Sequence, residues 1–178
     1  MVLYREVQGV LQPWLTALLA GPVVIVLFGL FQQVVLGRPW GNHPVSNRAF
    51  LLIAGALCLF VVWFLNLRLV TEVYPDTLVI GFPLLWPSRR VSFADIVSAR
   101  ATIYRPIADY GGWGIRWNFS TSTTAYTAKG NRAVMLRLVD GRNVLLGSQT
   151  PEELELVLVS RPPQIAPRLK LIARNHSW

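Results

Sequence analysis

Two long apolar runs dominate the first part of the chain, and an alternating pattern of apolar and polar residues follows them. The first run extends from Trp14 to Leu36 and the second from Ala49 to Leu65, and neither contains a charged side chain. A hydrocarbon core of about 30 Å is crossed by about 20 apolar residues in a helix, which satisfies its own backbone there. The pattern predicts a transmembrane helical hairpin over residues 14–66, with helices at about 14–36 and 49–66.

The residues around the two runs sharpen this prediction. The connection from Gly37 to Arg48 is rich in turn-forming residues and too short for a domain. Gln32 and Gln33 leave two interpretations open, contact with headgroups at the membrane boundary or hydrogen bonds to a partner helix. A cleavable signal peptide is disfavoured because the first run is long, its basic flank is only Arg5, and a second run follows. Residues 1–13 are expected to lie at the membrane interface.

From Leu67 onward the apolar positions alternate with period two, which is typical of strands. Pro75-Asp76 and Asp140-Gly141 have the chemistry of turns, and the second is expected to form a two-residue type I′ hairpin that pairs Leu136 with Leu145. The candidate strands are Arg68–Tyr74, Thr77–Phe82, Arg89–Phe93, Ile96–Tyr104, Gly114–Ser120, Ala125–Ala128, Ala133–Val139 and Arg142–Gly147.

A final helix is predicted after the strands. Thr150-Pro151-Glu152-Glu153 resembles a capping box, with proline in the first turn, and the helix must end before Pro162-Pro163. The glutamates at its start are explained by capping and by the helix dipole rather than by acid-base chemistry. Residues 161–178 carry four basic and no acidic side chains, so we expect a disordered basic tail that lies against the membrane.

Composition adds charge to this picture. The net charge is +8, and 14 basic against 8 acidic residues follow Asn66. A basic domain beside a bilayer faces anionic headgroups most simply, whereas no nucleic-acid-binding signature is present in the sequence. The single cysteine, Cys58, lies in the second apolar run, so no disulfide within the chain is possible and neither a metal site nor a cofactor is predicted.

Orientation follows from the basic residues near the helix ends. Arg38 and Arg48 lie in the short connection, while Arg5, the amino terminus and Arg68 lie on the other side, with further arginines after them. We therefore expect both termini and the C-terminal domain to be cytoplasmic.

The layout of the whole chain resembles a family. The motif Tyr110-Gly-Gly-Trp-Gly-Ile-Arg116, with Gly130–Val134 and Gly147–Glu153 after it, is similar to a pattern in small bacterial membrane-anchored proteins with a pleckstrin-homology-like (PH-like) domain. The resemblance implies an α+β membrane protein whose residues 67–160 form two packed antiparallel sheets of about seven strands with one C-terminal helix. It also implies the bacterial inner membrane, and it assigns no biochemical activity.

Two stretches stand out as candidate sites. Phe82 to Arg90 is expected to be a hairpin loop in which Leu84, Leu85 and Trp86 enter the bilayer surface while Arg89 and Arg90 meet phosphates. Packing of this loop onto the domain or the hairpin is the alternative.

The glycine-rich segment is the second candidate. Tyr110, Trp113 and Arg116 are expected to offer a surface to a partner or a headgroup, and Ile115, Trp117 and Phe119 to point inward along a strand. A bulged strand entrance, with Trp113 covering the core, is the structural alternative. The glycine spacing matches neither a dinucleotide fingerprint nor a phosphate-binding loop.

Catalytic chemistry finds no support in the sequence. The histidines, His43 and His176, lie in a loop and in the tail, and the aspartates are dispersed at turns and strand ends. The leading hypothesis is a non-enzymatic membrane protein whose cytoplasmic domain binds another membrane or membrane-associated protein. Direct recognition of anionic lipid by Leu84–Arg90 and the basic tail is second, and an enzyme with an unrecognised site is third. The oligomeric state stays open.

Overall fold

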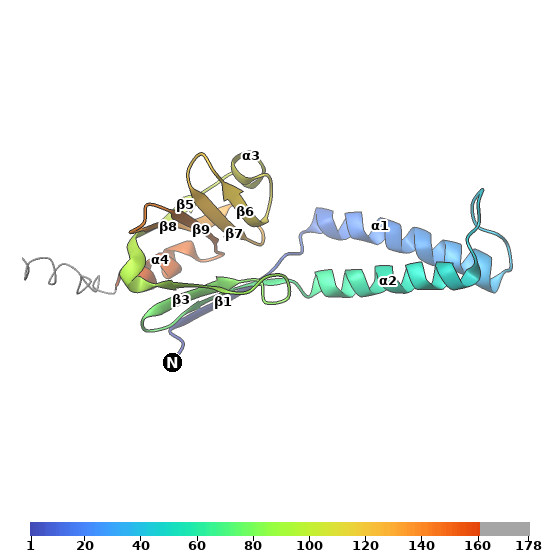
Figure 1. Ribbon diagram of the computed structural model, residues 1–178, viewed down its shortest axis with the longest axis horizontal. Helices are drawn as coiled ribbons and strands as arrows, with labels where there is room; N and C mark the ends of the chain where they lie inside the picture. The colour runs from blue at the N-terminus through green and yellow to red at the C-terminus, as the bar shows by residue number, and fades with distance from the viewer. Residues whose placement is uncertain (161–178) are drawn as a thin grey trace, which may run out of the picture. The chain divides into compact units, whose positions relative to one another are not determined.

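The computed structural model describes residues 1–160 and has an α+β architecture (Figure 1). In chain order the elements are β1 (Tyr4–Gly9), α1 (Pro13–Leu30), a π-helical segment (Phe31–Val35), α2 (Asn47–Leu65), β2 (Arg68–Val73), β3 (Thr77–Gly81), β4 (Arg89–Ser92), a 3-10 turn (Phe93–Asp95), β5 (Ile96–Ile103), α3 (Pro106–Tyr110), β6 (Gly114–Asn118), β7 (Thr123–Thr127), β8 (Arg132–Leu138), β9 (Asn143–Gly147) and α4 (Pro151–Val159). The predicted helices and all eight predicted strands are confirmed to within two residues at each end.

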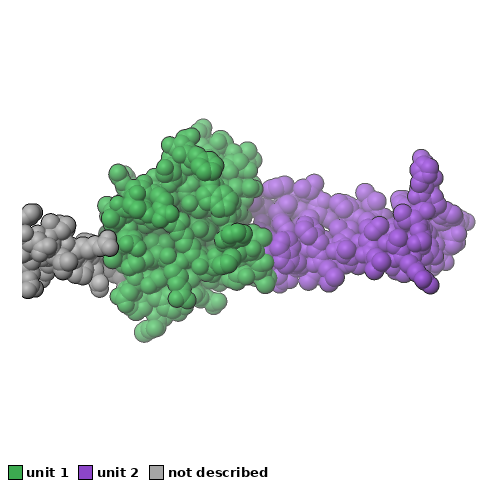
Figure 2. Space-filling model, in the orientation of Figure 1, with its two compact units in different colours: residues 1–9, 68–178 green, residues 10–67 purple. Residues whose placement is uncertain are grey.

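The chain divides into two compact units, which Figure 2 shows in different colours. One consists of residues 10–67, and the other combines residues 1–9 with the chain from Arg68 onward. The helical unit contains two helices that are long and apolar enough to cross a membrane, Pro13–Val35 and Asn47–Leu65, with mean hydropathies of 2.3 and 2.4. The second helix begins two residues before its prediction because Ser46 acts as its N-cap, accepting a hydrogen bond from the Ala49 N–H at 3.3 Å.

The helices of the hairpin meet around a glycine. A Cβ atom added at Gly29 would lie 2.8 Å from Phe50 Cζ and 3.0 Å from Trp40 Nε1, so only glycine allows this approach. Gln33 is 7% exposed and donates from Nε2 to the Val45 carbonyl at 2.7 Å and to Asn47 Oδ1 at 3.0 Å. Gln33 therefore forms hydrogen bonds to the partner helix, as one of the two interpretations predicted, because its amide bonds to the start of α2 and to the loop before it.

The amino-terminal segment departs from its prediction. Residues 1–13 do not form a separate interfacial segment, because Tyr4–Gly9 is strand β1 and pairs antiparallel with β2 in the register Gly9↔Arg68. Its inward side chains are polar. Gln8 is 2% exposed and donates to the Gly147 carbonyl at 2.7 Å, and Glu6 accepts from Ser148 Oγ at 2.7 Å. An apolar alternation could not reveal a strand that points polar groups inward.

The first sheet has the strand order β1-β2-β3-β4, so the whole helical unit is an insertion between two neighbouring, paired strands. The register also shows which loops and connections leave this sheet at the same end. Gly9 pairs with Arg68, and Val70, two residues further along β2, pairs with Gly81 at the end of β3. The β3–β4 loop therefore leaves the sheet at the end where the chain departs to and returns from the helices. The Pro75-Asp76 turn lies at the opposite end.

The second sheet has the order β5-β8-β9-β7-β6, and its pairing corrects two predictions. It is mixed rather than purely antiparallel, because β7 runs parallel to β9. The β8–β9 turn is not a two-residue turn, since Leu136 pairs with Val144 rather than Leu145. Gly141 has φ +81° and donates to the Leu138 carbonyl at 3.0 Å, which is the three-residue loop with a left-handed glycine.

The helix α4 closes the β domain. It packs against β5 and β8 and is seen between the two sheets in Figure 1. Its Leu154 is fully buried and Leu158 is 6% exposed. The predicted side-chain cap is absent, because Thr150 Oγ1 lies 3.0 Å from the Tyr4 hydroxyl instead of bonding the helix backbone. Residues 1–160 thus contain two sheets of four and five strands, one strand more than the eight predicted from the pattern and more than the seven or so that the resemblance implies.

Candidate functional site

The β3–β4 loop exposes a cluster of large apolar side chains at its tip. Leu84 is 56% exposed, Leu85 46% and Trp86 62%, while Phe82 at the base of the loop is buried. The Phe82 carbonyl accepts hydrogen bonds from the backbone N–H groups of Leu85 and Trp86, both at 2.8 Å. The tip (residues 84–86) is thus a tight turn fixed to the core, with its apolar groups directed outward.

The base of this loop depends on a glycine. A Cβ atom at Gly81 would lie 2.8 Å from the Ser88 Cα, so the two ends of the loop meet where no larger residue fits. Pro83 and Pro87 flank the tip and restrict its backbone further. The loop is therefore ordered before it meets any ligand.

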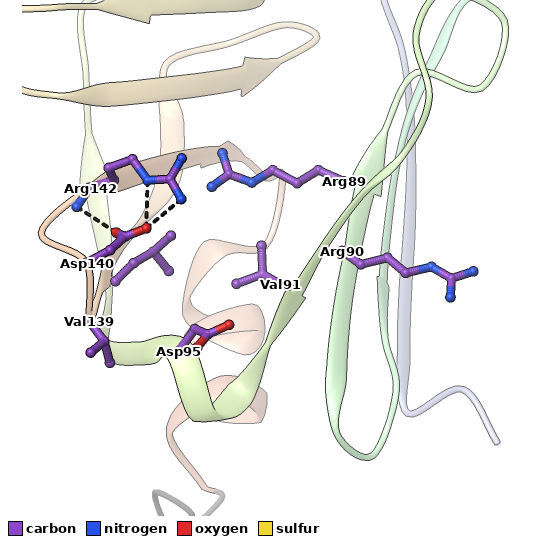
Figure 3. Close-up of a pocket in the computed structure, with 8 residues that line it drawn as sticks. Arg89, Arg90, Val91, Asp95, Val139, Asp140 and Arg142 are labelled. Carbon is purple, nitrogen blue, oxygen red and sulfur yellow. Dashed lines mark hydrogen bonds and ion pairs between the residues drawn. The ribbon is translucent and has the colours of Figure 1, made fainter. Parts of the chain in front are cut away.

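The two arginines beside the loop, Arg89 and Arg90, point to opposite faces of β4. Successive side chains of a strand point to opposite faces, and Figure 3 shows Arg89 directed toward Arg142 while Arg90 points away. Arg89 lines a cavity of about 470 Å³ with Asp95, Asp140 and Arg142. Arg90 is also in the lining of this cavity, but its side chain points away, and it lines a second cavity of about 610 Å³. The expectation that Arg89 and Arg90 meet phosphates stays a prediction, and their opposite directions separate the places where each could do so.

The first cavity balances its own charges. Arg142 donates from Nε to Asp140 Oδ2 at 2.6 Å and from its backbone N–H to Oδ1 at 2.9 Å. These hydrogen bonds lower the pKa of Asp140, and the positive charge of Arg89 adds to the effect. With Asp95 as a second carboxylate, the cavity holds both signs of charge rather than a cationic cluster.

The second cavity pairs Arg90 with Glu72 and Tyr74 in its lining. The Tyr74 hydroxyl donates to Glu72 Oε2 at 2.8 Å, and this bond raises the pKa of the tyrosine. Glu72 also accepts from Arg5 Nε at 3.0 Å across the β1–β2 pair. The carboxylate here already has partners, so this cavity too is a structural network at the sheet surface.

The glycine-rich segment is mainly structural. Tyr110 packs edge-on against Tyr104, with ring centroids 5.9 Å apart, beside a small core on the outer face of the second sheet. Trp113 Nε1 donates to the Gly130 carbonyl at 2.8 Å. Arg116 Nε donates to the Trp113 carbonyl at 3.2 Å. Of the three predicted partner-surface residues, Arg116 is the exposed one.

Trp117 and Phe119 contradict their prediction, since they are 62% and 91% exposed rather than inward. Ile115 and Trp117 do share a face with Tyr126, because Ile115 pairs with Tyr126 and Trp117 with Thr124. Tyr126 is 7% exposed on that face, but β6 is an edge strand. The alternation of apolar residues therefore predicted correctly that Ile115 and Trp117 share one face of the strand, which is the face of Tyr126. It could not predict that no other element of residues 1–160 covers this face at the edge strand.

Titratable groups give no further site in the described chain. Among residues 1–160 no cluster of three or more His, Cys, Asp or Glu side chains could hold a metal ion. The predicted basic tail, residues 161–178, lies outside the described residues. Comparison of the chain with protein-family models, curated proteins and solved structures gave no match.

Proposed function

We propose that the chain is an integral protein of the bacterial inner membrane, in which residues 10–67 span the bilayer as a helical hairpin. Both termini and the β domain lie on the cytoplasmic side, and the domain is a PH-like, non-enzymatic module that binds another protein. Two sheets closed by a C-terminal helix support the PH-like interpretation. Two apolar helices of 23 and 19 residues support the membrane placement.

The observation that carries this proposal is the place of the hairpin in the fold. It is inserted between β1 and β2, whose ends pair as Gly9↔Arg68, so the domain is tied to the helices by two adjacent chain segments. A domain tied in this way has a high local concentration at the membrane surface. Weak contacts with a partner in the same membrane are then sufficient for assembly.

The sheet edges indicate where a partner would bind. In the described chain the edge strand β5 is blocked where Glu155 accepts the Ala101 N–H at 2.8 Å, β4 is only four residues long, and β1 carries Arg5 and Glu6. The remaining edge, β6, exposes Arg116, Trp117 and, just beyond its end, Phe119. Tryptophan and arginine dominate binding energy at interfaces, and an extended segment can add to a free edge.

The test is purification of the full chain in mild detergent after photo-crosslinking from a probe at Trp117, with Val97 as the control position. Val97 is also 62% exposed but lies on β5, at the opposite edge of the same sheet. We expect a defined protein to crosslink at position 117 and not at position 97. We also expect the same protein to co-purify with the wild-type chain but not with a Trp117→Ala/Phe119→Ala double variant. Retention of the same partner by that variant would contradict the proposed surface.

Direct recognition of anionic headgroups is the second candidate, and the exposed tip of the β3–β4 loop favours it. It has less support because Arg89 and Arg90 leave opposite faces of β4. Lipid that co-purifies with the full chain separates the candidates. Enrichment of anionic lipid that disappears in Arg89→Ala but not in Arg90→Ala would favour lipid recognition through the cavity beside Asp140.

A further inference from the structure

The β3–β4 loop and the two chain connections to the helical unit lie at the same end of the first sheet. Gly9 pairs with Arg68, and β3 ends at Gly81 opposite Val70, two residues along β2. Residues 82–88 then continue beyond the sheet before β4 begins at Arg89. The tip formed by Leu84, Leu85 and Trp86 is thus presented in the direction in which the chain leaves for the hairpin.

The connections are too short to let this end of the sheet move far from the helices. Residues 10–12 separate β1 from α1, and residues 66–67 separate α2 from β2. An extended chain spans at most about 3.6 Å per residue, so Gly9 lies within about 14 Å of Pro13, and Arg68 within about 11 Å of Leu65. The headgroup region of a bilayer is several ångströms deep on each side, which brings the loop tip within its reach.

We infer that the tip of the β3–β4 loop inserts into the lipid–water interface on the side where α1 begins and α2 ends, as a third attachment to the membrane. The inference rests on the proposed insertion of residues 10–67. The ligand is the interface itself, because leucine partitions into acyl chains and tryptophan favours the headgroup boundary. Arg89 lines the cavity beside Asp140, and its charge is not needed for this contact.

The shape of the loop suits this role. Its turn is closed by two hydrogen bonds to the buried Phe82, and Pro83 and Pro87 limit its conformations, so little ordering is required on insertion. The two chain connections leave the sheet side by side at β1 and β2. Two adjacent attachments allow the domain to rock about the line that joins them. A third attachment at the β3–β4 side of the sheet fixes its tilt and thereby the surface that it offers to a partner.

The experiment places an environment-sensitive bimane label on the full-length protein in bilayers, using a Cys58→Ala background. Single cysteines are introduced as Leu85→Cys in the loop tip, Asp76→Cys in the turn at the opposite end of the same sheet, and Leu59→Cys in α2, where the native side chain is 73% exposed. Each labelled protein is quenched by brominated lipid from inside the bilayer and by iodide from the water. A thermal melt of each variant confirms that it is folded.

We expect brominated lipid to quench the labels at positions 85 and 59 several-fold more strongly than the label at position 76, and iodide to show the reverse order. A label at position 85 that behaves like the one at position 76, with position 59 still quenched by brominated lipid, overturns the loop insertion and leaves the membrane hairpin intact. Protection of position 85 from both quenchers also overturns it, since that result indicates a protein contact. Iodide quenching at position 59 overturns loop insertion and the proposed membrane placement together.

Discussion

The helical hairpin and the β domain distribute apolar side chains in opposite ways. In the domain, Ile80 and Leu145 are fully buried and most polar groups lie outside. In the hairpin, Leu52 and Leu59 are 75% and 73% exposed, while the polar amide of Gln33 is 7% exposed. The domain therefore has buried apolar side chains and exposed polar groups, whereas the hairpin has exposed apolar side chains and a buried polar one. Water explains the first arrangement, and the proposed insertion of residues 10–67 into lipid accounts for the second.

The pairing of β1 with β2 shows how the two units are connected along the chain. The hairpin is not attached to one end of the domain, because β1 precedes it and pairs with β2 after it. In the proposed membrane placement, the Gly9↔Arg68 pair requires both ends of residues 10–67 to lie on the same side of the bilayer. An even number of spanning helices is the simplest arrangement that satisfies this pairing.

The largest expected effect comes from removing the helical unit, residues 10–67. Residues 10–67 replaced by Asn-Gly would join Gly9 to Arg68 through a two-residue hairpin turn, the connection that paired antiparallel strands favour. We expect this variant to stay in the aqueous fraction without detergent and to fold, as measured by fractionation and circular dichroism. Wild-type protein is expected to require detergent.

A fragment that starts at Arg68 is the matched control for that variant. It lacks β1, so Ser148 and Gln149 lose the Glu6 carboxylate that accepts hydrogen bonds from both. We expect it to melt at a lower temperature than the Asn-Gly variant. Equal melting temperatures would show that β1 is dispensable and would weaken the comparison of the two units.

A pair of identical substitutions tests the two solvents directly. Leu145→Ala removes a fully buried side chain from the domain and should lower the free energy of unfolding by about 2–5 kcal/mol. Leu59→Ala removes contacts with lipid, which exist in the folded and separated helices alike, and should cost less than about 1 kcal/mol. Denaturant titration of the domain and detergent titration of the hairpin measure the two. Equal costs would contradict a lipid environment for α2.

The buried glutamine sharpens the comparison within the hairpin. Gln33→Leu leaves the Val45 carbonyl and Asn47 without the amide that bonds them, and we expect the helix pair to lose about 1–2 kcal/mol. Gln32→Leu is the control, because Gln32 precedes it in the same helical turn and is less buried. Titration with a denaturing detergent, followed by circular dichroism, reports the difference. A larger loss for Gln32→Leu would remove Gln33 from this role.

The smallest effect concerns alkaline pH, which acts on the domain rather than on the helices. Burial raises the pKa of Tyr104 above its ordinary value of 10.0, so the folded domain favours the neutral phenol. Its contribution to stability is complete below about pH 10 and is lost as the pH rises through the higher pKa of the folded state. Tyr104→Phe should flatten the fall of the domain's melting temperature above pH 10. An unchanged fall would assign it to other groups.

The sequence predicted the elements that depend on local patterns. The uncharged runs at Trp14–Leu36 and Ala49–Leu65 require helices whatever surrounds them, and strands such as Ala133–Val139 follow from period two. For the loop tip, the sequence left insertion into the bilayer and packing onto the protein open, and the structure shows Leu84, Leu85 and Trp86 exposed. The cytoplasmic placement of the domain and its binding of a partner stay predictions.

Other features depend on what packs against a residue, and the sequence alone did not reveal them. Segment Tyr4–Gly9 forms a strand because β2, more than fifty residues later in the chain, pairs with it, and because the Ser148 hydroxyl donates a hydrogen bond to Glu6 on its polar inner face. The opposite directions of Arg89 and Arg90, by contrast, follow from the local alternation of the predicted strand Arg89–Phe93.

What the sequence by itself determined is where the two long apolar helices lie and the period of each element, because both are properties of consecutive residues. Tertiary structure decided the rest: that β7 lies parallel to β9, that Trp117 on the edge strand is left uncovered, and that the helical hairpin interrupts a sheet. These outcomes depend on contacts between residues far apart in the chain. A local pattern specifies which face of a strand is apolar, whereas only the assembled sheets specify what covers that face.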